Sequence, residues 1–330
     1  MTTEPVTQKR SFVNSDATQK ILAFAGLIAM FFFFSLASDY FFQFSNITSI
    51  LLATSVNGIL ALGVTFVIIS AGIDLSVGTV MTLSAVMTGV FITNLGLPVW
   101  VGVLGGLLTG GLAGFSSGSF IAKMRIPPFI ATLGMLYIAK GLSLVISDLK
   151  PIYFTDTPSY NQISMGSVTG SIIPGFDIPN AVLIFFGAAF VAYIILTKTV
   201  LGRYTFAIGS NEEATRLSGV NVSLWKIAIY TLAGLFSGLA GVVIASRLNS
   251  AQPALGAGYE LEAIAAVVIG GTSLSGGEGT ILGTVIGAFV ISVLTNGLRI
   301  MSVPQEWQIV ITGAIVILAV WADILRRGRN

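Results

Sequence analysis

The 330-residue sequence contains no cysteine and no histidine. The absence of cysteine excludes disulfides, a thiol nucleophile and a thiolate metal site. The absence of histidine removes the commonest general base, the commonest metal ligand and the usual proton shuttle near neutral pH. We therefore expect no catalytic residue, no metal site and no cofactor on this chain.

Charge is also scarce. Charged residues make up 9% of the sequence, whereas an ordinary soluble domain carries about 25%. The mean hydropathy of +0.92 places the chain in a lipid bilayer. Apolar runs lie at about 21–38, 47–70, 76–95, 97–121, 128–147, 179–197, 225–246, 260–271, 281–298 and 307–322. They predict an all-α integral membrane protein with about ten transmembrane helices, of which the short eighth is broken or oblique.

The few basic residues orient the chain. If the first crossing starts inside, both termini are cytoplasmic and twelve of the sixteen basic residues fall on that side, as the positive-inside rule requires. The twelve are Lys9, Arg10, Lys20, Lys123, Arg125, Lys198, Arg203, Arg216, Lys226, Arg326, Arg327 and Arg329. We expect a cytoplasmic tail at 1–20 without a signal-peptide pattern, a membrane domain at 21–325 and a basic cytoplasmic C-terminus at 326–330.

Two polar segments interrupt the apolar pattern. The segment 198–226 is a compact cytoplasmic loop of mixed charge, which serves either as a docking loop or as a solvated connector with one short helix. The segment 148–178 lies outside, and its prolines rule out one long helix. It is either a small cap that docks a periplasmic partner or a solvated loop.

Two stretches, 66–90 and 265–290, resemble a weak internal repeat, because each passes through a Gly/Ser/Thr break that contains Leu-Ser-x-Gly. Paired, glycine-interrupted segments mark transport pathways; whether these are parallel or inverted stays open. Asp74 in the first break either caps the next helix or sits at the cytoplasmic surface, and a part in gating or substrate contact is the alternative to a structural role. The second break ends in neither a Walker A nor a dinucleotide pattern, so no nucleotide site is expected.

Isolated polar groups in apolar surroundings are candidates for a translocation path. A buried amide must be bonded, either across helices or to water and passenger in a cavity, and we favour the inter-helix bond for Asn57 and Asn296. Hydroxyls at the second break would suit a neutral polar passenger. The full candidate set is Asn57, Asp74, Ser76, Phe129, Thr132, Asn249, Gln252, Glu260, Thr272, Ser273, Ser275 and Asn296. Basic patches interleaved with aromatic residues are absent, so nucleic acid is not an expected partner.

Seven motifs in order resemble the permease subunit of bacterial ABC importers for monosaccharides, of the ribose type. They are Gly72-Ile-Asp-Leu-Ser-Val-Gly78, Pro128-Phe-Ile-Ala-Thr-Leu-Gly134, Leu201-Gly-Arg-Tyr204 with Gly209 to Gly219, Ser250-Ala-Gln-Pro253, Gly258-Tyr-Glu-Leu261, Ala263 to Val268, and Gly270-Gly-Thr-Ser-Leu274. Together they cover most of the chain apart from the N-terminal tail and the outer loop.

The resemblance implies a homodimer with a BtuC-like type II importer architecture in the bacterial inner membrane. It also implies a separate cytoplasmic ATPase subunit that holds ATP and Mg, a periplasmic sugar-binding protein, and surrounding membrane lipid. The coupling helix would be formed by Asn211, Glu212, Glu213, Ala214, Thr215, Arg216, Leu217, Ser218 and Gly219. Ribose is the leading passenger; xylose, galactose, a polyol, a nucleoside or a branched-chain amino acid stay open, as does a stand-alone secondary transporter.

Overall fold

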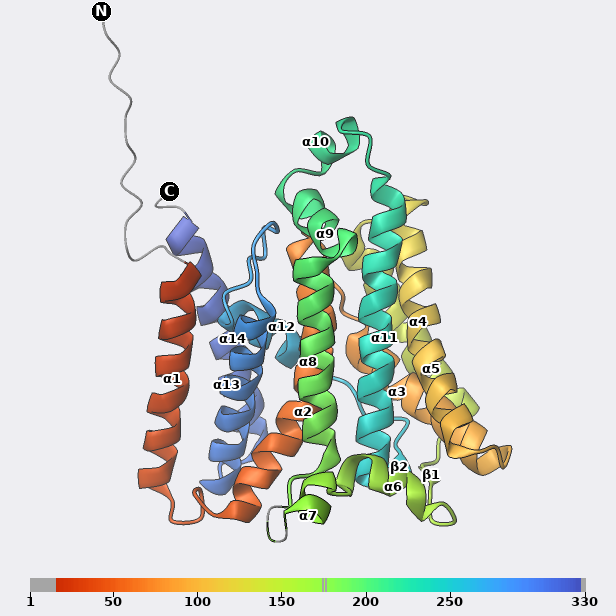
Figure 1. Ribbon diagram of the computed structural model, residues 1–330, viewed down its shortest axis with the longest axis vertical. Helices are drawn as coiled ribbons and strands as arrows, with labels where there is room; N and C mark the ends of the chain where they lie inside the picture. The colour runs from red at the N-terminus through yellow and green to blue at the C-terminus, as the bar shows by residue number, and fades with distance from the viewer. Residues whose placement is uncertain (1–15, 174, 176, 328–330) are drawn as a thin grey trace, which may run out of the picture.

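The computed structural model describes residues 16–173, 175 and 177–327, and within these ranges the protein is a bundle of helices (Figure 1). The long elements are α1 Asp16–Ala37, α2 Phe44–Ile69, α3 Val77–Gly89 with the π-helix η2 Val90–Asn94, α4 Val99–Ala122, α5 Pro128–Ile146, α8 Asn180–Lys198, α11 Val222–Leu248, α12 Tyr259–Ile269, α13 Ile281–Ile300 and α14 Gln305–Arg327. In the described chain, seven are long and apolar enough to cross a membrane: α2, α3 with η2, α4, α5, α8, α11 and α13.

The remaining helices are shorter or less apolar. The described parts of α1 and α14 contain apolar stretches at 23–37 and 305–318. Helix α12 has only 11 residues, which matches the prediction that the eighth apolar run is a broken helix. Helix α1 begins at Asp16, ahead of the predicted membrane-domain start at 21. The rest of the predicted tail, and the end of the predicted basic C-terminus at 328–330, lie outside the described residues.

Helix α2 is the core of the bundle. Its sequence is apolar on every side, and it is buried almost continuously from Leu52 to Ile69. This is expected for a helix without a polar face. Helices α8, α11, α12 and α13 pack around it. Because α2 ends at the first break, the core runs directly into one of the predicted functional segments.

A seam of glycines joins α4 to α11. A Cβ at Gly110 would lie 2.7 Å from the backbone nitrogen of Gly238 and against the carbonyl of Gly234. A Cβ at Gly114 would meet the carbonyl of Tyr230 in the same way. Small residues at four-residue spacing let two membrane helices approach until their backbones touch. This contact holds α11, which follows the charged loop, against the rest of the bundle.

The predicted outer connection is a folded cap. Strand β1 (Ile152–Tyr153) pairs antiparallel with β2 (Ser250–Ala251), and the short helices α6 (Pro158–Met165) and α7 (Val168–Ile172) follow it. The buried hydroxyl of Tyr160 donates to the Val242 carbonyl on α11 at 2.9 Å. Burial raises the pKa of Tyr160, so this group stays a donor. The cap is therefore fixed to the end of α11.

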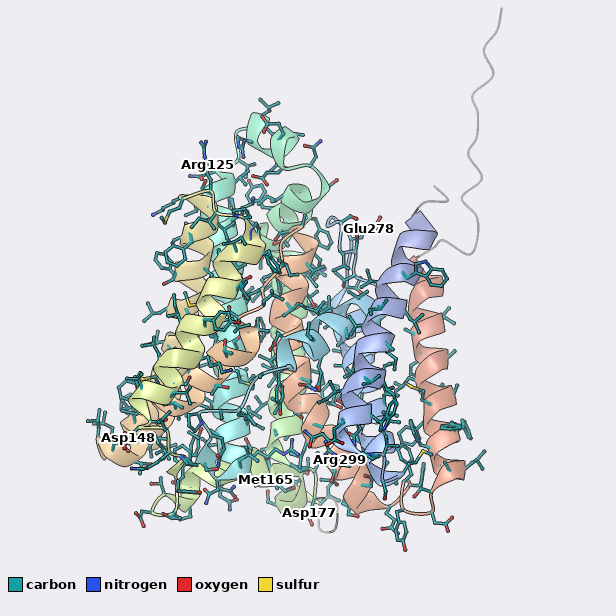
Figure 2. The ribbon with its side chains drawn as sticks, turned by 180° about the vertical axis from the view of Figure 1, so that it is seen from behind. Arg125, Asp148, Met165, Asp177, Glu278 and Arg299 are labelled. Carbon is teal, nitrogen blue, oxygen red and sulfur yellow. The ribbon has the colours of Figure 1, made fainter. Side chains whose placement is uncertain are left out.

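The two ends of the bundle differ. The charged loop, the described start of α1 and the described end of α14 lie at one end, and the cap with α6 and α7 lies at the other (Figure 1). Arg125 and Glu278 are at the first end, whereas Asp148, Asp177 and Arg299 are at the second (Figure 2). We call these the loop end and the cap end.

Candidate coupling site and translocation path

The charged loop folds into two helices, α9 (Val200–Ser210) and α10 (Glu212–Leu217). The Asn211 side chain accepts from the Ala214 amide at 2.9 Å and caps the start of α10. Gly219 has φ of 84° and ends the helix, with the Val220 amide bonded back to Thr215. The resemblance implied one short helix at 211–219; the sequence did not predict α9, whose glycines lower its helix propensity.

The charges of α10 are paired within the loop. Arg216 contacts Glu212 and Glu213, each at 2.9 Å. Lys226 at the start of α11 contacts Glu212 at 2.6 Å, and its side chain is only 20% exposed. Exposed pairs of this kind contribute less than about 1 kcal/mol each, but together they orient α10 on α11. Leu217 at the end of α10 is 80% exposed, which leaves an apolar side chain at the loop end for a partner to cover.

Gly209, in the last turn of α9, joins the loop to both breaks. The Gly277 amide in the second break donates to the Ile69 carbonyl at the end of α2, at 2.8 Å. A Cβ at Gly209 would lie 2.7 Å from that amide nitrogen and against that carbonyl. Gly276, with φ of 83°, lies against Ala71 at the same place. We call this three-way contact of Ile69, Gly209 and Gly277 the glycine joint.

In the first break, Asp74 is buried and bonded locally. Its Oδ1 accepts from the Ser76 amide at 2.8 Å and from the Ser76 hydroxyl at 2.6 Å. Ser76 is the residue before α3, so Asp74 bonds the amide just ahead of the helix, near where the capping hypothesis placed it, while the Ser76 side chain does not cap the first turn itself. The Tyr230 hydroxyl donates to the Ile73 carbonyl at 3.2 Å and ties the break to α11. The side chains of Asp74 and Ser76 are thus bonded within the protein, without a passenger.

In the second break, the hydroxyl residues divide. Thr272 and Ser273 are fully buried, and the Thr272 hydroxyl has no hydrogen-bond partner among the described residues. Ser275 is exposed, and its amide donates to the Ser273 hydroxyl at 3.1 Å. The Thr280 hydroxyl accepts from the Gly283 amide and caps α13. The break is therefore a packed turn at the loop end, and of its described hydroxyl residues Thr272, Ser273 and Ser275 only Ser275 is exposed.

A polar cluster lies between α2, α12 and α13. The Asn57 amide on α2 donates to the Glu262 carboxylate on α12. Glu262 also interacts electrostatically with Arg299 and Glu260, and Tyr259 interacts with Arg247 and Arg299. Ionisable groups inside a membrane bundle are functional candidates. The sequence named Asn57, Glu260 and Glu262 as candidates for the path, but it did not predict the bond of Asn57 to Glu262, because that bond joins residues 205 positions apart.

Most of the other residues predicted to line the path form hydrogen bonds within the protein. The Asn296 amide donates to Asn46 on α2 at 2.9 Å, which is the favoured inter-helix bond. Asn249 adopts a left-handed conformation at the end of α11, and Gln252 donates to Ser250 at 2.9 Å. Thr132 is buried and bonds its own helix at Pro128. Phe129 remains 50% exposed at the start of α5, so it is free to contact lipid, passenger or partner.

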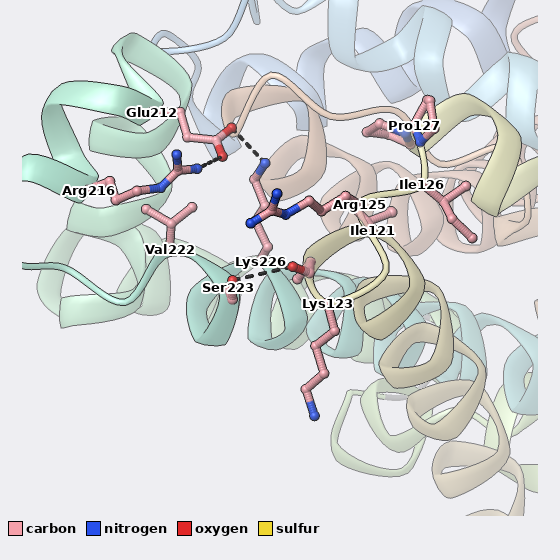
Figure 3. A pocket seen from close by; sticks show the side chains of 12 residues that line it. Ile121, Lys123, Arg125, Ile126, Pro127, Glu212, Arg216, Val222, Ser223 and Lys226 are labelled. Atoms are coloured by element: carbon pink, nitrogen blue, oxygen red, sulfur yellow. Dashed lines mark hydrogen bonds and ion pairs between the residues drawn. The ribbon is translucent and has the colours of Figure 1, made fainter.

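A cavity of about 760 Å³ lies beside α10 (Figure 3). One wall comes from Glu212, Arg216 and the start of α11, and the other comes from the α4–α5 loop, residues 123–127. The sequence did not predict this neighbour for the charged loop. The α4–α5 loop carries Lys123 and Arg125, which had been assigned only to the cytoplasmic side.

Broken apolar helices around an exposed charged helix agree with the comparisons of this chain with known proteins. The family model described as branched-chain amino acid transport system / permease component matches residues 46–320. The chain belongs to this permease family. Together with the seven apolar helices, this makes the protein a multi-pass inner membrane permease, whose relatives transport rather than catalyse.

Curated relatives align along almost the whole permease. The ribose import permease of Escherichia coli K12 is 40% identical, covering 98% of this chain and 99% of its own. The ribose import permease of Bacillus subtilis is 39% identical, covering 98% of both. The xylose transport system permease of Escherichia coli K12 is 33% identical, covering 97% of this chain and 95% of its own. No solved structure matches the permease.

Proposed function

We propose that the permease is the membrane-spanning subunit of an ATP-driven importer that passes a monosaccharide, ribose first, from a periplasmic binding protein to the cytoplasm. The higher identity to ribose permeases than to the xylose permease supports ribose. The observation that carries the importer is α10, a capped and exposed helix connected through the glycine joint to both breaks.

In this proposal, two copies with ten spans each form a type II importer with the path at the dimer axis. Both termini and α10 are cytoplasmic, and the cap faces the periplasm, because Arg125, Arg216 and Lys226 gather at the loop end. The ATPase is a separate subunit that holds ATP and Mg. The binding protein docks on the cap, whose bonds to α11 give it a rigid seat.

The geometry gives a route for coupling. An ATPase whose states bind α10 with different affinity shifts the permease between inward-open and outward-open forms. A displacement of α10 and α9 would be passed at Gly209 to the end of α2 and to the turn before α13, because their backbones are in direct contact. Helix α2 in turn carries Asn57 of the polar cluster. The loop end and the path thus share one helix.

The polar cluster is the proposed gate and sugar contact. A neutral sugar offers hydroxyls that both donate and accept, which suits the carboxylate of Glu262, the amide of Asn57 and the guanidinium of Arg299. Asp74, Ser76, Thr132, Thr272 and Ser273 are proposed to support the path rather than to line it, since their hydroxyls and carboxylate are buried in local structure.

The experiment is co-purification of the detergent-solubilised permease from its native host. The wild type is expected to bring down an ATPase and a sugar-binding protein. A variant with Glu213→Lys and Arg216→Glu keeps one opposite-charge pair on α10 but reverses its surface pattern. It should lose the ATPase and keep the binding protein. A wild type that comes down alone, yet moves ribose in sealed vesicles without ATP, would establish a secondary transporter instead.

The polar cluster also favours a second passenger. Glu262 and Arg299 are opposite charges that influence each other electrostatically close to the proposed path, and an amino acid has matching ammonium and carboxylate groups. The family description names branched-chain amino acid transport. Competition decides between them: unlabelled leucine should leave uptake of labelled ribose unchanged if the passenger is a sugar, and should suppress it if the path accepts an amino acid.

A further inference from the structure

The cavity beside α10 is strongly basic. Its lining includes four cations, Lys123, Arg125, Arg216 and Lys226, and one carboxylate, Glu212, which gives a formal charge of +3. Figure 3 shows Arg125, Arg216, Glu212 and Lys226 converging on it from the α4–α5 loop, α10 and α11, whereas the end of Lys123 points away. We call this the basic cavity.

With Glu213, which lies outside the lining and pairs with Arg216, the net charge is +2, and it belongs to the two cations of the α4–α5 loop. Arg216 and Lys226 are neutralised by Glu212 and Glu213. Lys123 and Arg125 are exposed and have no ion pair within the described ranges 16–173, 175 and 177–327. An unpaired guanidinium at the wall of a concave surface is a ready site for a carboxylate or a phosphate, which it binds bidentately.

The backbone at Arg125 indicates that its side chain has a use. Arg125 has φ of 56°, and the Ile126 amide bonds back to the Phe120 carbonyl at 3.2 Å, which closes the end of α4. The position that closes a helix in this way is usually glycine, because a Cβ disfavours positive φ. Arginine therefore stands at a place where the fold alone favours glycine. Such outliers gather at functional sites.

We propose that the basic cavity binds an acidic side chain of the cytoplasmic ATPase subunit, with Arg125 as the main contact. This rests on the proposed function, since it adds a second contact to the docking of α10. Glu212 and Arg216 belong both to α10 and to the cavity wall, so a protein seated on α10 covers the cavity. The α4–α5 loop then reports the position of the ATPase to α5, independently of the glycine joint.

The test measures the affinity of the purified ATPase for the permease in detergent at low and high salt. Arg125→Gly removes the charge at a position where glycine suits the backbone, so its thermal stability should equal or exceed that of the wild type. Its affinity should fall roughly tenfold at low salt, with a weaker salt dependence. Arg125→Glu should weaken binding further. Lys198→Ala removes an exposed cation at the end of α8, outside the cavity lining, and should bind as the wild type does.

Three other outcomes would contradict the proposal, each for a different reason. Wild-type affinity in both Arg125 variants would overturn the proposal while leaving α10 as the docking site. Unchanged ATPase affinity, with reduced binding to vesicles that contain phosphatidylglycerol, would assign the cavity to lipid headgroups and also overturn it. Failure of the wild type itself to bind the ATPase would defeat the proposed importer, and the second contact with it.

Discussion

Gly209 is the residue at which the charged loop touches both breaks, and there is no room there for even one added methyl group. In Gly209→Ala the new Cβ meets the Ile69 carbonyl and the Gly277 amide, and these backbone atoms have no side chain that can rotate aside. We expect a loss of roughly 2 kcal/mol in unfolding free energy. ATP-driven uptake should fall by more than this loss explains, because the added methyl group forces apart the backbones through which a displacement of α10 is passed. Melting in detergent and uptake in vesicles measure the two effects.

The matched control for that substitution is Gly187→Ala on α8. A Cβ there has no neighbour within 4 Å, and alanine is favoured over glycine in a helix by up to about 1 kcal/mol. Gly187→Ala should therefore melt at or above the wild-type temperature and transport normally. If Gly209→Ala behaves in the same way, the joint does not carry coupling.

Glu262 tests the polar cluster at the same scale. Glu262→Ala leaves the buried Asn57 amide without its acceptor, which costs roughly 1–3 kcal/mol. Glu262→Gln keeps an oxygen for Asn57 but removes the negative charge that interacts electrostatically with Arg299. We expect Gln to restore most of the stability and not the transport rate. Restoration of both by Gln would show that the carboxylate is purely structural.

Among the elements, α4 and α11 depend on their glycine seam. In Gly110→Ala, the Cβ meets the backbone of Gly234 and Gly238, so the helices must move apart along the seam. The unfolding free energy should drop by roughly 1–3 kcal/mol. Gly134→Ala on α5, where no atom lies within 4 Å, should change it little. Equal melting of the two variants would contradict backbone contact between α4 and α11.

Helix α10 depends on its cap. Asn211→Ala removes the acceptor for the Ala214 amide, at a cost of about 1 kcal/mol to a helix of six residues. We expect a lower affinity for the ATPase with an almost unchanged melting temperature, because α10 lies outside the core. Asn211→Asp, which keeps a capping oxygen, should retain the affinity. Weak binding by Asp as well as Ala would mean that the amide itself contacts the partner.

At the scale of the whole molecule, the sequence predicted what local patterns encode. The apolar runs predicted the long helices, the short eighth run predicted α12, and the resemblance to monosaccharide permeases implied the short helix at 211–219 that the structure shows as α10. It could not predict the glycine joint, the bond of Asn57 to Glu262, or the α4–α5 loop as a wall of the basic cavity. Each brings together residues distant in sequence, and backbone approach at glycine leaves no periodic signal.

The central claim is that ATP hydrolysis on a separate subunit drives sugar entry through contacts at α10. The direct measurement is uptake of labelled ribose into proteoliposomes that contain the permease and its ATPase, with the binding protein outside and ATP inside. We predict uptake against a gradient for the wild type with ATP. The wild type without ATP should show no such uptake. The variant that combines Glu213→Lys and Arg216→Glu should show none even with ATP. Equal uptake with and without ATP, or full activity of the exchanged variant, would contradict the account.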